Sequence, residues 1–260
     1  MSQPYELVAL DVDGTIVDWE NQMTSTVREA VRAVAASGVH VVLSTGRSVP
    51  GVMDAADKLG FDDGVAVASN GAVTMSYRPV EVLSTITFDA RETVKLLLEH
   101  VPDAAVAVEE IGRGYRINKP FPEGEISGEM VLQSVDELVA EPVTRVIIRS
   151  PDQSAEEFIE LAERLGLHGT NYFVGYTAWL DLAPSGVTKA SGLESIAVRL
   201  GVERSKVLAI GDGRNDLEML RWAGRGVAMG AAPVEVQDAA DDVTETVEND
   251  GVAKELARWF

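Results

Sequence analysis

VALDVDGT, residues 8–15, places two carboxylates directly after a short run of apolar residues. Continuous apolar runs favour strands that are buried on both faces, as in a parallel sheet. Asp11 and Asp13 stand two positions apart where this predicted strand ends, so both can face one site once the chain turns. Gly14 permits a close approach that a Cβ atom would obstruct. By chance the pattern arises in only about one such chain in a hundred, which favours a functional site over an aspartate-rich turn.

The same alternation of short apolar runs and helical patterns recurs toward both ends of the chain. Apolar runs predict further strands at 39–43, 65–68, 207–210 and 226–229. Helical periodicity predicts helices at 25–37, at 50–59 and from about Asn215 onward. Strands that alternate with helices predict an α/β fold with a doubly wound, mostly parallel sheet. Ligands of such sheets bind beyond the carboxyl ends of the strands.

The middle of the chain differs, because predicted strands there follow one another directly. The predicted order is a helix, two strands, an irregular stretch, a strand, a helix and two strands, at 91–100, 105–109, 115–118, 120–128, 144–149, 155–165, 171–174 and 178–182. Successive strands favour antiparallel pairing. We therefore expect residues 82–183 to form an α+β domain inserted into a core made of residues 1–81 and 184–260.

A second acidic cluster, GDGRND at 211–216, also follows a predicted strand. Asp212 and Asp216 lie four positions apart across a strand-to-helix turn, so they can converge on the edge of the sheet that carries Asp11. Carboxylate oxygens are the ligands that Mg²⁺ requires. The alternative is a structural role for Asp216, because a negative charge in the first turn of a helix is stabilised by the helix dipole. Four aspartates at two strand ends repel one another, which favours a bound cation.

Two further polar features are weaker when each is taken alone. STGR at 44–47 ends another predicted strand, and its hydroxyls and backbone N–H groups could hold a phosphate oxygen. The same composition is also ordinary for a loop. Lys189 begins a predicted helix, and a single lysine is usually a solvated surface residue. Its functional interpretation therefore depends on the other motifs.

The composition bounds the class of protein. Apolar residues make up 46% of the chain, which is ordinary for a folded globular protein. The absence of cysteine excludes disulfides, thiolate metal sites and cysteine nucleophiles. A formal net charge of −20 disfavours nucleic-acid and membrane partners. Without a secretory signal or a membrane-length apolar run, we expect a cytoplasmic protein; its oligomeric state is not readable from the sequence.

Together these segments resemble the haloacid dehalogenase-like hydrolase superfamily, and their order resembles its Cof-type phosphatases. Three further segments extend the resemblance over essentially the whole chain: SNGA at 69–72, GVAMG at 226–230 and NDGVA at 249–253. The resemblance implies a Rossmann-like core with a large inserted cap of the C2 type. The cap matches only in the order of its elements.

The resemblance also implies a mechanism and a role for each matching residue. Asp11 would be the nucleophile that forms an aspartyl-phosphate, and Asp13 the general acid and then the base. Mg²⁺ would be held by Asp11, by the backbone carbonyl of Asp13 and by Asp212, and Asp216 would support the metal site either as a direct ligand or through another ligand. The phosphoryl group would be bound by Thr45, Lys189 and Asn215, with Ser44 as the alternative hydroxyl.

Recognition of an anionic substrate by an acidic protein needs local basic groups. The segment 111–119 of the inserted domain is the densest such group, and we expect Arg113, Arg116 or Lys119 to read the leaving group. The alternative is a solvated hairpin. Arg47 and Asn70 are candidates on the core side of the same site.

The sequence therefore predicts a Mg²⁺-dependent phosphatase that acts on a small phosphorylated metabolite, such as a sugar phosphate or a phosphorylated cofactor. A phosphotransferase or mutase acting on sugar phosphates would use the same nucleophile. A non-catalytic module that binds phosphometabolites is a third hypothesis, which the intact motifs disfavour.

Overall fold

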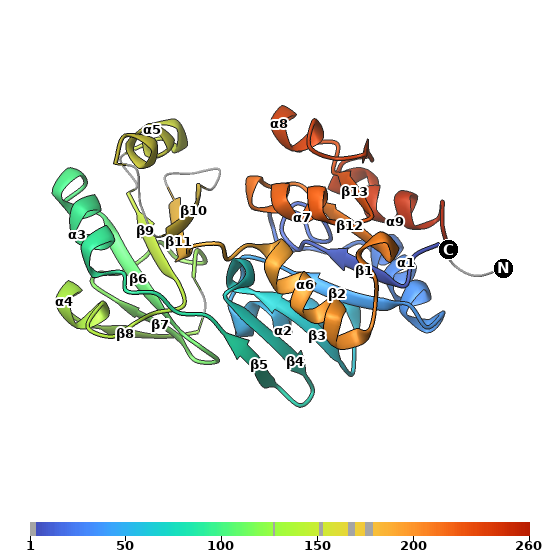
Figure 1. Ribbon diagram of the computed structural model, residues 1–260, viewed down its shortest axis with the longest axis horizontal. Coiled ribbons are helices and arrows are strands. Elements are labelled where there is room, and N and C mark those ends of the chain that lie inside the picture. Colours follow the sequence, from blue (N-terminus) through green and yellow to red (C-terminus); the bar gives the residue numbers. More distant parts are fainter. Residues whose placement is uncertain (1–3, 127, 151–152, 166–169, 175–178) are drawn as a thin grey trace. The chain divides into compact units, whose positions relative to one another are not determined.

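A computed structural model describes residues 4–126, 128–150, 153–165, 170–174 and 179–260. The chain divides into two compact units, each with its own sheet (Figure 1). Unit 1 contains residues 1–47, 52–84 and 188–260, and unit 2 contains 48–51 and 85–187. The chain returns from unit 2 to unit 1 between residues 187 and 188, whereas the sequence predicts this boundary between 183 and 184.

Unit 1 is built on a sheet of strand order β14-β13-β12-β1-β2-β3-β4-β5. Its strands are β1 Leu7–Leu10, β2 His40–Ser44, β3 Gly64–Ala68, β4 Val73–Tyr77, β5 Glu81–Thr85, β12 Val207–Gly211, β13 Arg225–Ala228 and β14 Asp242–Val243. Neighbours from β14 through β3 pair in parallel, and β4 turns back antiparallel to β3. The predicted doubly wound, mostly parallel sheet is confirmed.

The helices of unit 1 cover both faces of this sheet (Figure 1). They are α1 Ser25–Ala36, α2 Val49–Leu59 (from residue 52 onward), α6 Lys189–Leu200, α7 Leu217–Trp222, α8 Val234–Gln237 and α9 Gly251–Leu256. Right-handed crossovers place helices on opposite faces when the chain moves from β1 toward β3 and from β12 toward β13. Accordingly Leu193 and Ile196 of α6 pack with Leu7 and Ala9 of β1. The intervening side chains of the strand point to the opposite face of the sheet.

Unit 2 contains a sheet of order β10-β11-β9-β6-β7-β8. The strands are β6 Ala105–Glu110, β7 Gly114–Ile117, β8 Glu129–Leu132, β9 Val146–Arg149, β10 Thr170–Val174 and β11 Trp179–Pro184. Successive strands pair antiparallel, both β6 with β7 and β10 with β11, as predicted. Residue 178, the predicted start of the last strand, lies outside the described residues.

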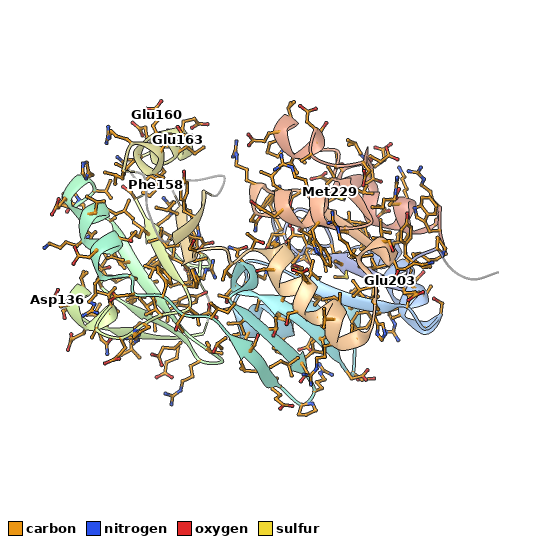
Figure 2. The ribbon with its side chains drawn as sticks, viewed as in Figure 1. Asp136, Phe158, Glu160, Glu163, Glu203 and Met229 are labelled. Atoms are coloured by element: carbon orange, nitrogen blue, oxygen red, sulfur yellow. The ribbon has the colours of Figure 1, made fainter. Side chains whose placement is uncertain are left out.

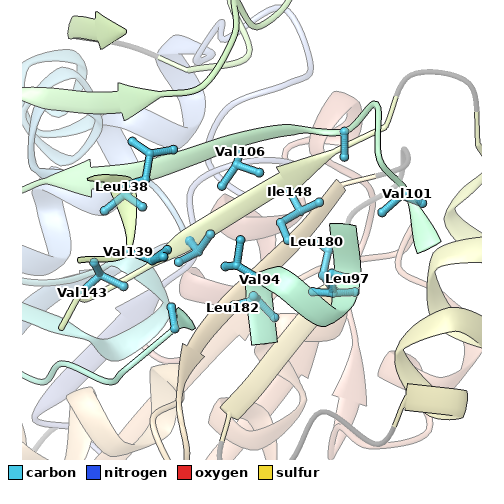
Figure 3. Close-up of a cluster of buried hydrophobic side chains, with 14 of the residues drawn as sticks. Val94, Leu97, Val101, Val106, Leu138, Val139, Val143, Ile148, Leu180 and Leu182 are labelled. Atoms are coloured by element: carbon cyan, nitrogen blue, oxygen red, sulfur yellow. The ribbon is translucent and has the colours of Figure 1, made fainter. Parts of the chain in front are cut away.

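One face of the unit 2 sheet is covered by helices that bury an apolar core. The helices of this unit are α3 Arg91–His100, α4 Val135–Leu138 and α5 Ala155–Leu165. Val94 and Leu97 of α3 pack over Val106 and Ile148 of the sheet (Figure 3). On α5, Phe158 is fully buried in the same core (Figure 2). Unit 2 therefore has a hydrophobic core of its own.

Two elements of unit 2 are missing from the sequence-based prediction. Strand β8 pairs parallel with β7, and the short helix α4 follows it. All four residues of β8 are exposed, so it lacks the buried apolar pattern by which a strand is recognised. In the part of the chain that the structure describes, no helix is long and apolar enough to cross a membrane.

The topology of unit 1 determines where a ligand can bind. From β1 the chain runs to β2 on one side, whereas β12 lies on the other side of β1. The strand order therefore reverses between the neighbouring strands β1 and β12. Asp11 directly follows β1, and Asp212 directly follows β12. The two predicted acidic motifs meet at this switch point.

Candidate active site

Three buried carboxylates converge at the carboxyl ends of β1 and β12. Oxygens of Asp11, Asp212 and Asp216 lie within 4.8 Å of one another. The hydroxyl of Thr15 lies 3.2 Å from Oδ2 of Asp11 and 3.5 Å from Oδ1 of Asp212, so it links the two motifs. The parallel register of Leu10 with Ile210 places these strand ends side by side.

Gly14 is required by this convergence. Its φ of 74° lies in the left-handed region, and a Cβ at this position would come 2.3 Å from Oδ2 of Asp212. Any side chain here would push Asp212 away from Asp11. The prediction that Gly14 permits a close approach is confirmed.

Lys189 lies between the carboxylates and is completely buried. It is the first residue of α6, whose N-cap is Thr188. Its Nζ donates to Oδ1 of Asp11 at 2.5 Å and to Oδ1 of Asp216 at 2.7 Å. The alternative of a solvated surface lysine is therefore wrong.

The carboxylate of Asp216 accepts hydrogen bonds from three donors on neighbouring groups. Its Oδ1 accepts from Lys189, and its Oδ2 accepts from the backbone N–H groups of Asp212 at 3.0 Å and Gly213 at 2.9 Å. The helix-start interpretation and the metal-site interpretation of Asp216 are thus both compatible with its position. These contacts fix the loop that carries Asp212.

The electrostatics of this cluster favour a positively charged ligand. Burial and the charge of Asp216 raise the pKa of Asp11 to about 7, although Lys189 opposes the shift. Burial also raises the pKa of Asp216, again against the effect of Lys189. Lys189 itself is desolvated, but the charges of Asp11 and Asp216 more than offset this and raise its pKa. Three carboxylates face one ammonium group, so the fully ionised cluster lacks positive charge.

The hydroxyl motif lies at the end of β2. Thr45 is buried, and its Oγ1 accepts a hydrogen bond from the backbone N–H of Arg47 at 3.1 Å. Ser44 is the last residue of β2, and its buried Oγ has no hydrogen-bond partner among the described residues. Both hydroxyls therefore remain candidates for binding a phosphoryl oxygen.

Asn70 and Asn215 interact directly, although they are 145 positions apart. Nδ2 of Asn215 donates to Oδ1 of Asn70 at 2.9 Å. Asn70 is almost fully buried and has a positive φ of 53°, as does Ser69 before it at 51°. Asparagine tolerates this region better than most residues. Asn70 is placed to orient Asn215.

Arg47 contacts Asp13 through a two-pronged interaction. Nη2 lies 2.6 Å from Oδ1 of Asp13, and Nε lies 3.0 Å from Oδ2. The same guanidinium group donates to Asp54 and Asn21. The side chain of Asp13 therefore faces Arg47, so a contribution of this residue to a metal site would come from its backbone, as the resemblance implies.

The three basic candidates of unit 2 lie on and around β7. Arg116 forms an ion pair with Glu110 at 2.7 Å and contacts the carbonyl oxygen of Glu137. Lys119 donates to the carbonyl oxygen of Asp103 at 2.8 Å. Arg113 is exposed in the turn before β7. Local contacts of this kind favour the alternative of a solvated hairpin, and a role in substrate recognition stays a prediction.

The sequence predicts no role for Thr15, Asn21 or Asp54. Thr15 belongs to the DVDGT motif, and its position four residues after Asp11 is the signal that could have identified it. In the described part of the chain, Asn21 and Asp54 are connected to the site through Arg47, and no spacing in the sequence connects them.

Comparison with known proteins agrees with this geometry. A family model described as haloacid dehalogenase-like hydrolase matches residues 8–256. The chain therefore belongs to the haloacid dehalogenase-like hydrolases. The resemblance to the Cof-type phosphatases of this family is confirmed, and the protein is an enzyme of that group.

The relatives match the chain over nearly its whole length. The 5-amino-6-(5-phospho-D-ribitylamino)uracil phosphatase YcsE of Bacillus subtilis is 30% identical over 98% of this chain and 95% of its own. A phosphoglycolate phosphatase of Methanoculleus marisnigri is 30% identical over 96% of this chain and 94% of its own. The solved structure of BT1666, from a study of phosphatases of this superfamily in Bacteroides thetaiotaomicron, is 29% identical, with a TM-score of 0.80 over 98% of this chain and 95% of that chain.

Proposed function

We propose that this protein is a Mg²⁺-dependent phosphatase that hydrolyses a small phosphorylated metabolite through an aspartyl-phosphate on Asp11. The observation that carries the proposal is the position of the Asp11 carboxylate. It is buried at the switch point of the sheet, 2.5 Å from Nζ of Lys189 and close to Asp212. A carboxylate beside fixed positive charge is suited to attack a phosphoryl group and to be regenerated afterwards.

The residues present fit a magnesium ion. Asp11 and Asp212 offer hard oxygen ligands at adjacent strand ends, and burial together with the negative charge of Asp216 raises the pKa of Asp11. A divalent cation would hold Asp11 in its ionised, nucleophilic form and neutralise charge on the phosphoryl oxygens. Asp216 would support the site through Lys189 and the backbone of Asp212.

In the first step Asp11 attacks phosphorus while the bond to the leaving oxygen breaks. Asp13 donates a proton to that oxygen, so an alcohol leaves rather than an alkoxide. Lys189 uses two of its three N–H donors on Asp11 and Asp216, so the third can donate to the phosphoryl group. Thr45 and Asn215 would donate to the other phosphoryl oxygens.

In the second step Asp13 takes a proton from water, and the water oxygen attacks phosphorus. The acyl-phosphate bond breaks, Asp11 is regenerated and inorganic phosphate leaves. The covalent intermediate divides one difficult displacement between two anions into two easier ones.

Small metabolites are the substrate class that the relatives support. One relative is named for a phosphorylated ribitylaminouracil and another for phosphoglycolate, both of which are small phosphate monoesters. A sugar phosphate or a phosphorylated cofactor precursor belongs to this class.

A panel of phosphorylated metabolites, with release of inorganic phosphate as the readout, tests the proposal. We expect Mg²⁺-dependent turnover by the wild type and a loss of at least a thousandfold in Asp11→Asn, which cannot form the phosphoenzyme. Equal rates for the two proteins would contradict the proposed nucleophile and favour a binding module. Appearance of a new phosphate ester with added sugars, in place of free phosphate, would favour a phosphotransferase.

A further inference from the structure

Arg47 belongs to a hydrogen-bond network that begins on the surface of unit 1 and ends at Asp13. Its Nη1 donates to Oδ2 of Asp54 at 3.1 Å, and its Nη2 donates to Oδ1 of Asn21 at 2.9 Å. Asn21 and Asp54 also contact each other, with Nδ2 of Asn21 3.1 Å from Oδ2 of Asp54. The guanidinium group is therefore held from two sides before it reaches Asp13.

The two residues that hold Arg47 are themselves fixed. Asp54 lies on α2, one turn before Lys58, whose Nζ is 2.5 Å from its Oδ1. Asn21 belongs to a tight loop in which Oδ1 of Asp18 accepts from the backbone N–H groups of Glu20 and Gln22. The backbone of Arg47 is also held, because its carbonyl oxygen accepts from Ser69 at 2.9 Å.

This arrangement leaves Arg47 little capacity to bind substrate. Arginine has five N–H donors. Nε and one Nη2 donor go to Asp13, the other Nη2 donor to Asn21, and one Nη1 donor to Asp54, which leaves one. A phosphate clamp would need two parallel donors that are available together.

Asp13, in contrast, depends on Arg47 for its orientation. Its side chain is 47% exposed, and among the residues that the structure describes its carboxylate is held by Arg47. A planar fork that meets both oxygens fixes the plane of the carboxylate as well as its position. Transfer of a proton to a leaving oxygen requires such orientation, since an error of about 1 Å costs a large part of the rate.

We infer that Arg47 is a positioning residue for Asp13, and that Asn21 and Asp54 are the anchors that hold Arg47 in place. The inference rests on the proposed function, in which Asp13 protonates the leaving group. It assigns no direct contact with substrate to Arg47, which differs from the role that the sequence predicts.

The dependence of the rate on the leaving group tests this inference. p-Nitrophenyl phosphate has a good leaving group that needs little protonation, whereas phenyl phosphate has nearly the same shape and a poorer one. The value of kcat/KM reports the steps through departure of the leaving group. The variant is Asn21→Gly with Asp54→Ala, which keeps Arg47 and removes both anchoring side chains; glycine accepts the φ of 59° at residue 21.

We expect kcat/KM of the double variant to fall about tenfold for phenyl phosphate and less than about twofold for p-nitrophenyl phosphate. Replacing Asp54 also removes a negative charge. The weaker repulsion of the anionic substrates would by itself raise kcat/KM for both of them. Asp57→Ala is the matched control, because Asp57 lies on the same helix and forms its ion pair with Arg78 instead of Arg47. This control should leave the ratio between the two substrates unchanged.

An unchanged ratio in the double variant, or an equal fall for both substrates, would overturn the inference. Both anchors lie on loops or helix faces near solvent, and a thermal unfolding curve like that of the wild type establishes that the variant is folded. Failure of the proposed function has a different signature: the wild type would then turn over neither substrate, or Asp11→Asn would turn over both. Arg47→Lys provides a second test, because a lysine cannot form the fork and should reproduce the changed ratio.

Discussion

Asp11 combines a buried position with a pKa that is raised to about 7, against 3.8 for an ordinary aspartate. Between these two pH values the folded protein holds a proton that the unfolded chain has released. Stability from this source is therefore present below pH 4 and is lost as the pH rises through 7. Each unit of pKa shift corresponds to about 1.4 kcal/mol.

This linkage predicts a pH-dependent effect of Asp11→Asn in a chelating buffer. The variant cannot acquire the charge, so its free energy of unfolding relative to the wild type should rise by about 2–3 kcal/mol between pH 5 and pH 8. Urea denaturation at the two pH values measures the difference. Asp62→Asn, at a side chain that is 97% exposed, is the control and should follow the wild type. Parallel curves for Asp11→Asn and the wild type would contradict the prediction.

At the same scale, the sequence predicts the residues of the site better than it predicts their contacts. Asp11, Lys189 and Asp212 are recognised because motifs at strand ends meet once the sheet forms. The partners of Arg47 are not recognised, because Asn21 and Asp54 are ordinary polar residues in a loop and on a helix. The sequence does not show whether an arginine after a strand end contacts the substrate or another side chain. The contacts of Arg47 follow from the three-dimensional structure.

The packing between two elements of unit 1 depends on Gly71. The 3₁₀ turn Ser69–Gly71 ends against the N-terminus of α6, and a Cβ on Gly71 would come 2.1 Å from the carbonyl oxygen of Thr188. Gly71 also has a φ of 103°, in the left-handed region. A side chain would therefore be strained by its backbone and would displace the residue that caps α6.

Gly71→Ala should lower the free energy of unfolding by about 2–5 kcal/mol, the sum of backbone strain and overlap. Gly38→Ala is the matched control, because Gly38 also has a positive φ, of 90°, but no atom lies within 4 Å of its Cβ position. This control should lose only about 1–2 kcal/mol. Chemical denaturation of both variants measures the difference, and equal losses would show that the contact with Thr188 is unimportant.

Elements are predictable from the sequence where burial imposes a pattern. Strands β1, β2, β3 and β12 have continuous apolar runs because helices cover both faces of the sheet. The hairpin of β4 and β5 and the edge strand β8 lack such runs. In β5 and β8 nearly every side chain is exposed, so backbone hydrogen bonds alone define these strands.

At the scale of the whole molecule, each unit has its own hydrophobic core, and the acidic cluster belongs entirely to unit 1. A ligand that binds only the folded form stabilises the part of the protein whose unfolding destroys its site. At a hundredfold excess over its dissociation constant, the gain is about 2.7 kcal/mol.

We therefore expect Mg²⁺ to raise the unfolding temperature of unit 1 and to broaden or split the calorimetric transition relative to a chelating buffer. Asp212→Asn should abolish this response, because it removes a carboxylate of the cluster. Glu235→Gln, which replaces an exposed carboxylate of unit 1, is the control and should respond like the wild type. A wild-type transition that is insensitive to Mg²⁺ would contradict the proposed metal site.

The complete burial of Lys189 has a consequence for chemical labelling. An ammonium group that solvent does not reach, and that two carboxylates keep protonated, is a poor target for acylating reagents. Mild acetylation of the folded enzyme should therefore modify exposed lysines such as Lys254 while leaving Lys189 intact. Peptide mapping after denaturation would then find the amine of Lys189 unmodified, which would measure its protection from solvent in the folded chain.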